Sequence, residues 1–225
     1  MCFSPQADLI GGAVVTVLGV DALRHVRFRR DLPIAALPLI LGTHQLVETF
    51  VWWGLQGHVS ASVGNTAKWI YLAVAFVLLP TFVPIAVIAI ERDRKRQRLM
   101  IPFAVIGAVV SVSLAVAMVS GPVTARLAGL HIAYGIGLKY GWLIVSLYVV
   151  ATCGSLLVSS HQPIVIFGIV NLVVVVLLAW FQQNGFASLW CGWAALTSVA
   201  IAMHLRYKGP IAVGAQRALQ GGRTT

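Results

Sequence analysis

Charged residues are scarce in this sequence. Only 10% of the 225 residues are Asp, Glu, Lys or Arg, and six of them are acidic, whereas soluble domains carry about 25% charge. This scarcity excludes an ordinary water-soluble fold and a disordered chain. The sequence also lacks the Walker A, His-Glu-x-x-His, Gly-x-Ser-x-Gly and Cys-x-x-Cys motifs. No familiar catalytic signature is therefore present, and the class of enzyme, if any, stays open.

Apolar residues make up 59% of the chain and fall into seven blocks. Each block holds roughly 18 to 24 residues, which is about the length that crosses a bilayer as a helix. We therefore predict an all-α polytopic membrane bundle with a single domain over residues 1–225 and no separate soluble domain. The seventh block contains no lysine, which excludes a rhodopsin-type retinal Schiff base. The predicted helices are 5–24, 33–55, 68–90, 99–119, 139–158, 163–181 and 185–205.

Basic residues are distributed unevenly between the two sides of this predicted bundle. If the chain weaves through the membrane, 13 of its 16 Lys and Arg residues lie on the side that follows the first, third and seventh helices. Cytoplasmic loops carry such an excess, so the N-terminus is predicted outside and a basic tail, residues 206–225, in the cytoplasm. The basic loops suit anionic lipid headgroups. No nucleic-acid recognition motif accompanies the charge, so nucleic acid is not the expected partner.

The segment 120–138 between the fourth and fifth predicted helices is too apolar for a solvated loop and too rich in glycine for a confident helix. An interfacial or re-entrant segment packed on the outer end of the bundle fits this composition best.

The second helix contains the most informative polar residues. His44, Glu48 and Trp52 are spaced four residues apart and share one helix face, which Gln45 flanks. An acid inside a membrane costs several kcal/mol unless it is paired or protonated, so Glu48 is a functional candidate by default. His44 can donate to Glu48, titrate with it or share a metal ion. The alternative is a buried pair that only fixes helix packing.

A metal ion is the one cofactor that the residues suggest. Ser4 and Pro5 are typical of a helix start, so Cys2 is predicted at the outer surface, where its thiol could reach Glu48. His131, also predicted outside, is a further candidate ligand. The candidate metal set is Cys2, His44, Glu48 and His131, and the candidate ligand- or ion-binding set is Glu48, His44, Gln45, Trp52 and Cys2.

The first quarter of the chain resembles a family of uncharacterised bacterial integral membrane proteins. Chains of that family begin Met-Cys-Phe-Ser and carry a Gln-x-x-Glu-x-x-x-Trp pattern in the second helix. Residues 1–4 match the start, and Gln45, Glu48 and Trp52 match the pattern. The chain departs from the family at His44 and Thr49. The resemblance implies a multi-pass protein of the bacterial inner membrane and no established activity.

Three classes of function remain open. The first is a transporter-like protein that binds a small molecule or ion in the outer half of the bundle. The second is a membrane enzyme or metal-binding protein that uses Cys2, His44 and Glu48. The third is an accessory subunit that associates with itself or with a larger membrane complex, its polar residues specifying only packing.

Overall fold

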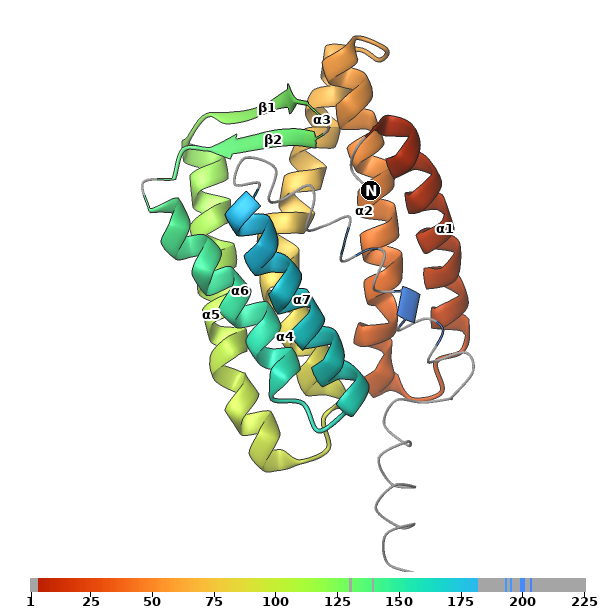
Figure 1. Cartoon of the computed structure of the whole chain (residues 1–225), viewed down its shortest axis with the longest axis vertical. Helices are drawn as coiled ribbons and strands as arrows, with labels where there is room; N and C mark the ends of the chain where they lie inside the picture. The colour runs from red at the N-terminus through yellow and green to blue at the C-terminus, as the bar shows by residue number, and fades with distance from the viewer. Residues whose placement is uncertain are drawn as a thin grey trace, which may run out of the picture.

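The computed structural model describes residues 4–129, 131–138 and 140–181, together with a few isolated positions between 193 and 203. The described chain is mostly helical (Figure 1). Its elements are α1 (Pro5–Arg24), the short η1 (Arg29–Asp31), α2 (Leu32–Gln56), α3 (Ala61–Leu72), the π-helical segment η2 (Ala73–Leu78), α4 (Leu79–Ile90), α5 (Arg94–Ser120), β1 (Val123–Ala128), β2 (His131–Ile136), α6 (Gly141–Leu157) and α7 (Gln162–Phe181).

Four of the described helices are long and apolar enough to cross a membrane. They are α1, the η1–α2 helix, the continuous α3–η2–α4 helix and α5. Two shorter apolar helices follow, Gly141–Leu157 and Gln162–Leu177. The third helix begins at Ala61, earlier than predicted, and the fourth begins at Arg94. The seventh predicted helix, 185–205, lies almost wholly outside the described residues, so the count of seven spans and the orientation of the termini stay predictions.

The segment after α5 is a β-hairpin, so the described fold is mostly helical with a small two-stranded sheet rather than all-α, and the interfacial or re-entrant placement of the segment stays a prediction. Strands β1 and β2 pair antiparallel from Val123↔Ile136 to Ala128↔His131. Gly129 has φ +67° at the turn, a conformation that glycine adopts without steric cost. Side chains alternate between the two faces of a strand. The composition of the segment does not reveal this two-residue periodicity, so the strands were not predicted. Two strands suffice here because Ile132 is buried against the helices.

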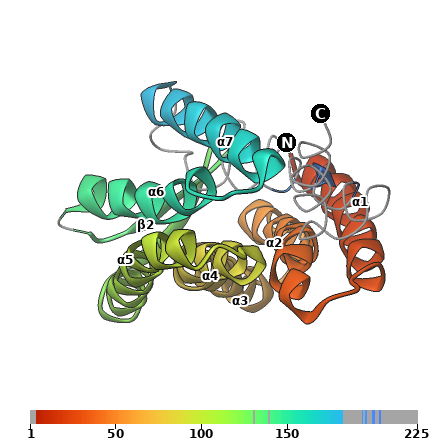
Figure 2. The ribbon, with the colours of Figure 1, turned by 90° about the horizontal axis from the view of Figure 1, so that it is seen from below.

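Helices α1 and α2 pack closely through small residues. A Cβ on Gly19 would lie 2.4 Å from the backbone N of Leu39, and a Cβ on Gly42 would lie 2.5 Å from the backbone N of Thr16. Only glycine permits such an approach between helices. Figure 2 shows α1 beside α2, with α6 and α7 on one side of α4 and α5. The antiparallel α1–α2 pair therefore forms one edge of the bundle and supplies the main wall of the site described below.

The third helix widens at its middle into η2. Pro80 follows two residues after this segment. Proline has no N–H to donate, and its ring clashes with the carbonyl four residues earlier in a regular α-helix. A wider turn relieves this clash. The Tyr148 hydroxyl donates a hydrogen bond to the Ala75 carbonyl at 2.8 Å, so α6 satisfies a carbonyl of the widened segment.

Candidate functional site

The polar face predicted for the second helix is buried in the structure. His44, Glu48 and Trp52 have exposed fractions of 2%, 0% and 4%, and Gln45 lies beside them at 3%. All four lie in the half of α2 that is nearer the β-hairpin, and we call this end of the bundle the hairpin end (Figure 1). Glu48 therefore lies inside the protein, where an ionisable group can be held by polar neighbours.

Three aromatic rings from three elements stack beside Glu48. The His44 ring lies on the Tyr71 ring of α3, with centroids 4.0 Å apart and planes 12° from parallel. Tyr71 lies in turn against Tyr134 of β2, at 4.7 Å and 17°. The Tyr134 hydroxyl then donates a hydrogen bond to Glu48 Oε1 at 3.3 Å. The hairpin thus covers the polar face of α2 and closes a cluster whose members are far apart in sequence.

Asp8 belongs to the same region, and the sequence analysis missed it. The Trp52 indole N–H donates to Asp8 Oδ2 at 2.9 Å, and Asp8 is 0% exposed. An acid in a first helical turn is ordinarily explained by the helix dipole and solvent. Here Asp8 precedes Gly12 by one turn, on the face that packs against α2. The helical spacing of Asp8 and Gly12 is the sequence feature that could have placed Asp8 on this face. We define the hairpin-end cluster as Asp8, His44, Glu48, Trp52, Tyr71 and Tyr134.

His44 has hydrogen-bonding capacity that the described residues leave unused. Neither Nδ1 nor Nε2 has a hydrogen-bond partner among the described residues, although both atoms are buried. A buried polar atom without a partner costs about 1–3 kcal/mol. The stack on Tyr71 orients the ring but satisfies neither nitrogen. A ligand that donates to one nitrogen and accepts from the other would remove this cost.

The candidate metal set is only partly described. Cys2 lies outside the described residues. His131 is the first residue of β2 and pairs with Ala128 across the hairpin turn. Among the described residues, no three His, Cys, Asp or Glu side chains lie together in a group that could hold a metal ion. The structure therefore brings His44 and Glu48 into one cluster without gathering His131 to them as a third ligand.

A second buried carboxylate lies at the opposite end of the bundle, which we call the loop end and define by residues 29–31, 91–93 and 158–161. Glu91 Oε1 accepts hydrogen bonds from the backbone N–H groups of Arg92 and Asp93, at 2.9 and 3.1 Å. Ser160 donates its hydroxyl to Oε1 and its backbone N–H to Oε2, each at 2.7 Å. Glu91 thus joins the α4–α5 loop to the α6–α7 loop. Glu91 and Ser160 are 69 residues apart, so the sequence alone does not indicate this contact.

The hydrogen bonds at the loop end also set its protonation states. Burial raises the pKa of Glu91, but the hydrogen bonds from Ser160, Asp93 and Arg92 together outweigh it and leave the pKa below its ordinary value. Burial lowers the pKa of His161, and Arg92 lowers it further against the opposing effect of Glu91. The loop end therefore favours an ionised Glu91 and a neutral His161.

Comparison with known proteins assigns the chain to a family. No curated protein and no solved structure matches the chain. The family of unknown function DUF6629 matches residues 1–216. This match agrees with the expectation of an uncharacterised family and covers nearly the whole chain, so the protein belongs to DUF6629.

Proposed function

We propose that the protein is a transporter-like membrane protein that binds a small polar solute or a cation in the hairpin-end cluster. The observation that carries the proposal is His44, which is 2% exposed and has two ring nitrogens without a hydrogen-bond partner among the described residues. His44 lies one helical turn from Glu48 on α2. Imidazole and carboxyl groups so placed can accept from and donate to one small ligand.

The surroundings of the two side chains suit binding better than helix packing alone. The stacked Tyr71 and Tyr134 rings give the cluster an aromatic wall, and such a wall favours cations and flat polar groups. Tyr134 belongs to the hairpin and not to a membrane helix. Movement of the hairpin would break the bond from Tyr134 to Glu48 without unpacking α1 from α2, which gives a ligand a route to the cluster.

The test uses purified protein and a panel of inorganic cations, amines, amino acids and sugars, with thermal stabilisation as the readout. We expect at least one member to stabilise the wild type. His44→Phe, which keeps a ring but removes both nitrogens, and Glu48→Gln should each weaken that stabilisation about tenfold or more. His58→Phe is the matched control, because His58 is exposed near the turn after α2. If no compound binds, or if His44→Phe binds normally, the proposal is wrong.

A metal-binding protein or membrane enzyme is the second candidate, because an unpartnered imidazole beside a carboxyl also suits a metal ion. Elemental analysis of the purified protein distinguishes it from the first. Metal at about one ion per chain that is lost in His44→Phe and in Cys2→Ser favours the second candidate, whereas flux into liposomes that depends on Glu48 favours the first. Co-purification with a larger membrane complex, without either property, favours an accessory role.

The finer topology belongs to this proposal. Seven spans, an outside N-terminus and a cytoplasmic basic tail in the bacterial inner membrane would put the hairpin-end cluster on the outer side and the basic loops against anionic lipid. A tag placed after Thr225 should then stay protected from membrane-impermeant reagents in intact cells. A tag that such a reagent reaches contradicts this topology.

A further inference from the structure

The loop end contains a buried carboxylate that Glu91 does not explain. Asp31 is the last residue of η1 and is 0% exposed. Neither of its carboxylate oxygens has a hydrogen-bond partner among the described residues. The charged or titratable groups that act on it electrostatically are Arg30, Arg92 and His161, yet none of them forms an ion pair with it within the described structure. A buried carboxylate of this kind requires a donor from outside the described chain.

The three residues that act on Asp31 electrostatically also carry unused hydrogen-bonding atoms. The Nε atoms of Arg30 and Arg92 and the Nε2 atom of His161 are buried, and none has a hydrogen-bond partner among the described residues. The loop end therefore offers two acceptor oxygens together with arginine donors. Guanidinium groups are well suited to phosphate, and a carboxylate is suited to an ammonium group. A ligand that carries both a phosphate and an amine matches the two sets at once.

The loops that carry these groups are held in place. Ser160 and Glu91 tie the α6–α7 loop to the α4–α5 loop, and the Arg96 guanidinium donates to the carbonyl oxygens of Val158 and Ser159 at 2.9 and 3.2 Å. Gln97 donates to the Glu91 carbonyl at 2.7 Å, at the end of α4. A ligand would therefore meet preorganised groups and lose little affinity to ordering them.

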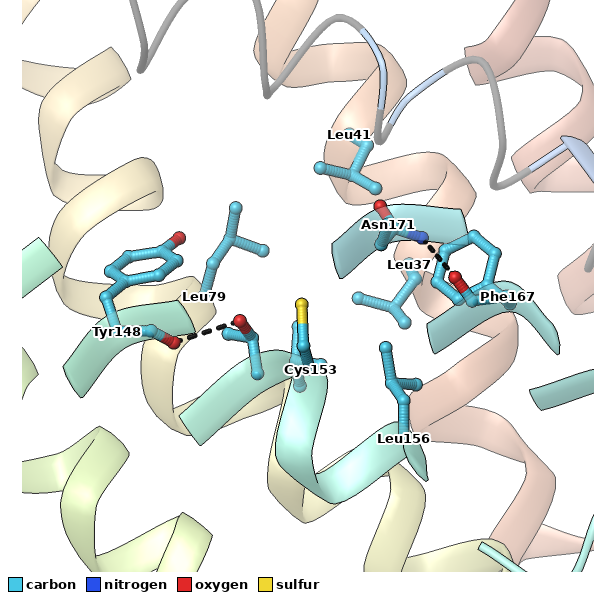
Figure 3. A pocket seen from close by; sticks show the side chains of 10 residues that line it. Leu37, Leu41, Leu79, Tyr148, Cys153, Leu156, Phe167 and Asn171 are labelled. Atoms are coloured by element: carbon cyan, nitrogen blue, oxygen red, sulfur yellow. Dashed lines mark hydrogen bonds between the residues drawn. The ribbon is translucent and has the colours of Figure 1, made fainter. Parts of the chain in front are cut away.

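An apolar crevice lies between the helices that lead away from these loops (Figure 3). Its cavity volume is about 60 Å³, within about 520 Å³ of empty space that includes open solvent. Leu37 and Leu41 of α2, Leu79 of α4, Leu156 of α6 and Phe167 of α7 are among the residues that line it. Leu37 follows Asp31, and Phe167 follows His161, by six residues, which is about 9 Å along a helix.

The polar residues in the wall of the crevice donate to backbone carbonyls. Asn171 Nδ2 donates to Phe167 at 2.8 Å, Thr152 to Tyr148 at 2.9 Å, and Tyr148 to Ala75 at 2.8 Å. The wall that remains is apolar and suits hydrocarbon. The same four helices therefore have a polar site at their loop ends and an apolar crevice further along.

We propose that the loop end binds one phospholipid whose headgroup carries a primary amine and a phosphate, as in phosphatidylethanolamine. The amine donates to Asp31, the phosphate accepts from Arg30 and Arg92, and an acyl chain follows the crevice between α2, α4, α6 and α7. Headgroup sites between membrane helices are commonly basic, and the buried Asp31 adds selectivity for the amine. The site is remote from the hairpin-end cluster and does not rest on the function proposed for it.

The test is lipid retention by native mass spectrometry after the purified full chain is relipidated with phosphatidylethanolamine, phosphatidylcholine or phosphatidylglycerol. We expect about one phosphatidylethanolamine per chain to be retained, about tenfold better than the other two lipids, since one has a quaternary amine without N–H donors and the other has no amine. Asp31→Asn should abolish this preference. Asp21→Asn is the matched control, because Asp21 lies on α1, outside the residues that define the loop end, where it pairs with His25.

Further variants and a soluble headgroup distinguish binding of the headgroup from binding of the acyl chain. Arg92→Ala should weaken the retention of all three lipids. Cys153→Phe, which fills the crevice, should weaken retention of phosphatidylethanolamine while leaving its preference over the other headgroups intact. Free phosphoethanolamine should stabilise the protein far less than the whole lipid. Equal retention of the three lipids by the wild type, or an unchanged preference in Asp31→Asn, overturns the proposal. Stabilisation by phosphoethanolamine equal to that by the lipid overturns the crevice part.

Discussion

The two ends of the bundle bury their glutamates in different ways. At the hairpin end, Glu48 Oε1 accepts a hydrogen bond of 3.3 Å from the Tyr134 hydroxyl, next to the His44 imidazole, whose two nitrogens have no hydrogen-bond partner among the described residues. At the loop end, Glu91 accepts four hydrogen bonds of 2.7 to 3.1 Å, three of them from backbone N–H groups. A backbone N–H cannot rotate to another partner as a side chain can, so these hydrogen bonds hold the two loops in place. The contrast indicates that Glu91 stabilises the loops it joins, whereas Glu48 lies beside an imidazole whose nitrogens a ligand can satisfy.

Removing Glu91 gives the strongest test of this contrast. Glu91→Ala should lower the free energy of unfolding by about 3–5 kcal/mol, because four donors lose a buried charged acceptor. Glu48→Gln should lower it by no more than about 1.5 kcal/mol. Chemical denaturation in detergent measures both. Asp93→Ala is the control, since its exposed side chain accepts one hydrogen bond as a helix cap and otherwise pairs with Arg96 at 4.0 Å. An equal loss in the Glu91 and Glu48 variants contradicts the division of roles.

The α1–α2 pair, which carries Asp8, His44, Glu48 and Trp52 of the hairpin-end cluster, depends on close helix packing, and Gly19 tests this. Gly19→Val places a branched side chain against the Leu39 backbone, where even a Cβ would lie 2.4 Å from N. We expect a loss of about 1–3 kcal/mol from forced separation of α1 and α2. Ala13→Val, on the exposed face of α1, should change stability little when the same denaturation is repeated. Tolerance of valine at position 19 would show that α1 is free to move.

Acidification should weaken the loop end in two stages. The pKa of His161 is lowered from 6.5 in the folded protein, so the unfolded chain takes up its proton first and stability falls below pH 6.5. The pKa of Glu91 is also lowered, from 4.5, so its contribution is present above pH 4.5 and is lost as pH falls through the folded pKa. Unfolding temperatures from pH 8 down to about pH 2.5 measure both stages. His161→Asn should remove the first stage only, and a profile that this variant leaves unchanged would rule out His161.

The smallest expected effect is that of Tyr134→Phe. The variant keeps the aromatic stack and removes only the hydrogen bond to Glu48, so stability should fall by about 0.5–1.5 kcal/mol. Tyr140→Phe serves as the control, because Tyr140 is 61% exposed. Ligand affinity for the hairpin-end cluster should change more than stability does. A large loss of stability with unchanged affinity would instead give Tyr134 a structural role.

The elements that the sequence predicted well are those whose evidence is local. The first helix was predicted at 5–24, the bounds observed for α1, because Ser4 and Pro5 form an ordinary helix start and the Ser4 hydroxyl accepts from the Ala7 N–H. His44 and Glu48 were grouped from their helical spacing alone.

The features that were missed depend on contacts between distant segments. Tyr134 reaches Glu48 across 86 residues, and Glu91 reaches Ser160 across 69. The hydrophobic periodicity of a single helix or strand carries no information about which distant segment it contacts. The strands of the hairpin were not predicted because they are short and half apolar, and composition alone does not reveal that they pair. Asp8 was overlooked because a first helical turn supplies its own reason for an acid.

The π-helical segment η2 makes the third helix tolerant of one particular change in its length. Tyr71 lies just before this segment, whereas Leu79 and Pro80 lie after it. A π-helical turn holds about one residue more than an α-helical turn, so removing one residue between positions 73 and 78 would restore a regular α-helix and leave the two halves near their present orientation. Tyr71 would then keep its place between His44 and Tyr134. The same deletion within the regular helix α4 would turn its two parts by about 100° relative to each other, so a one-residue deletion should be tolerated within η2 and not within α4.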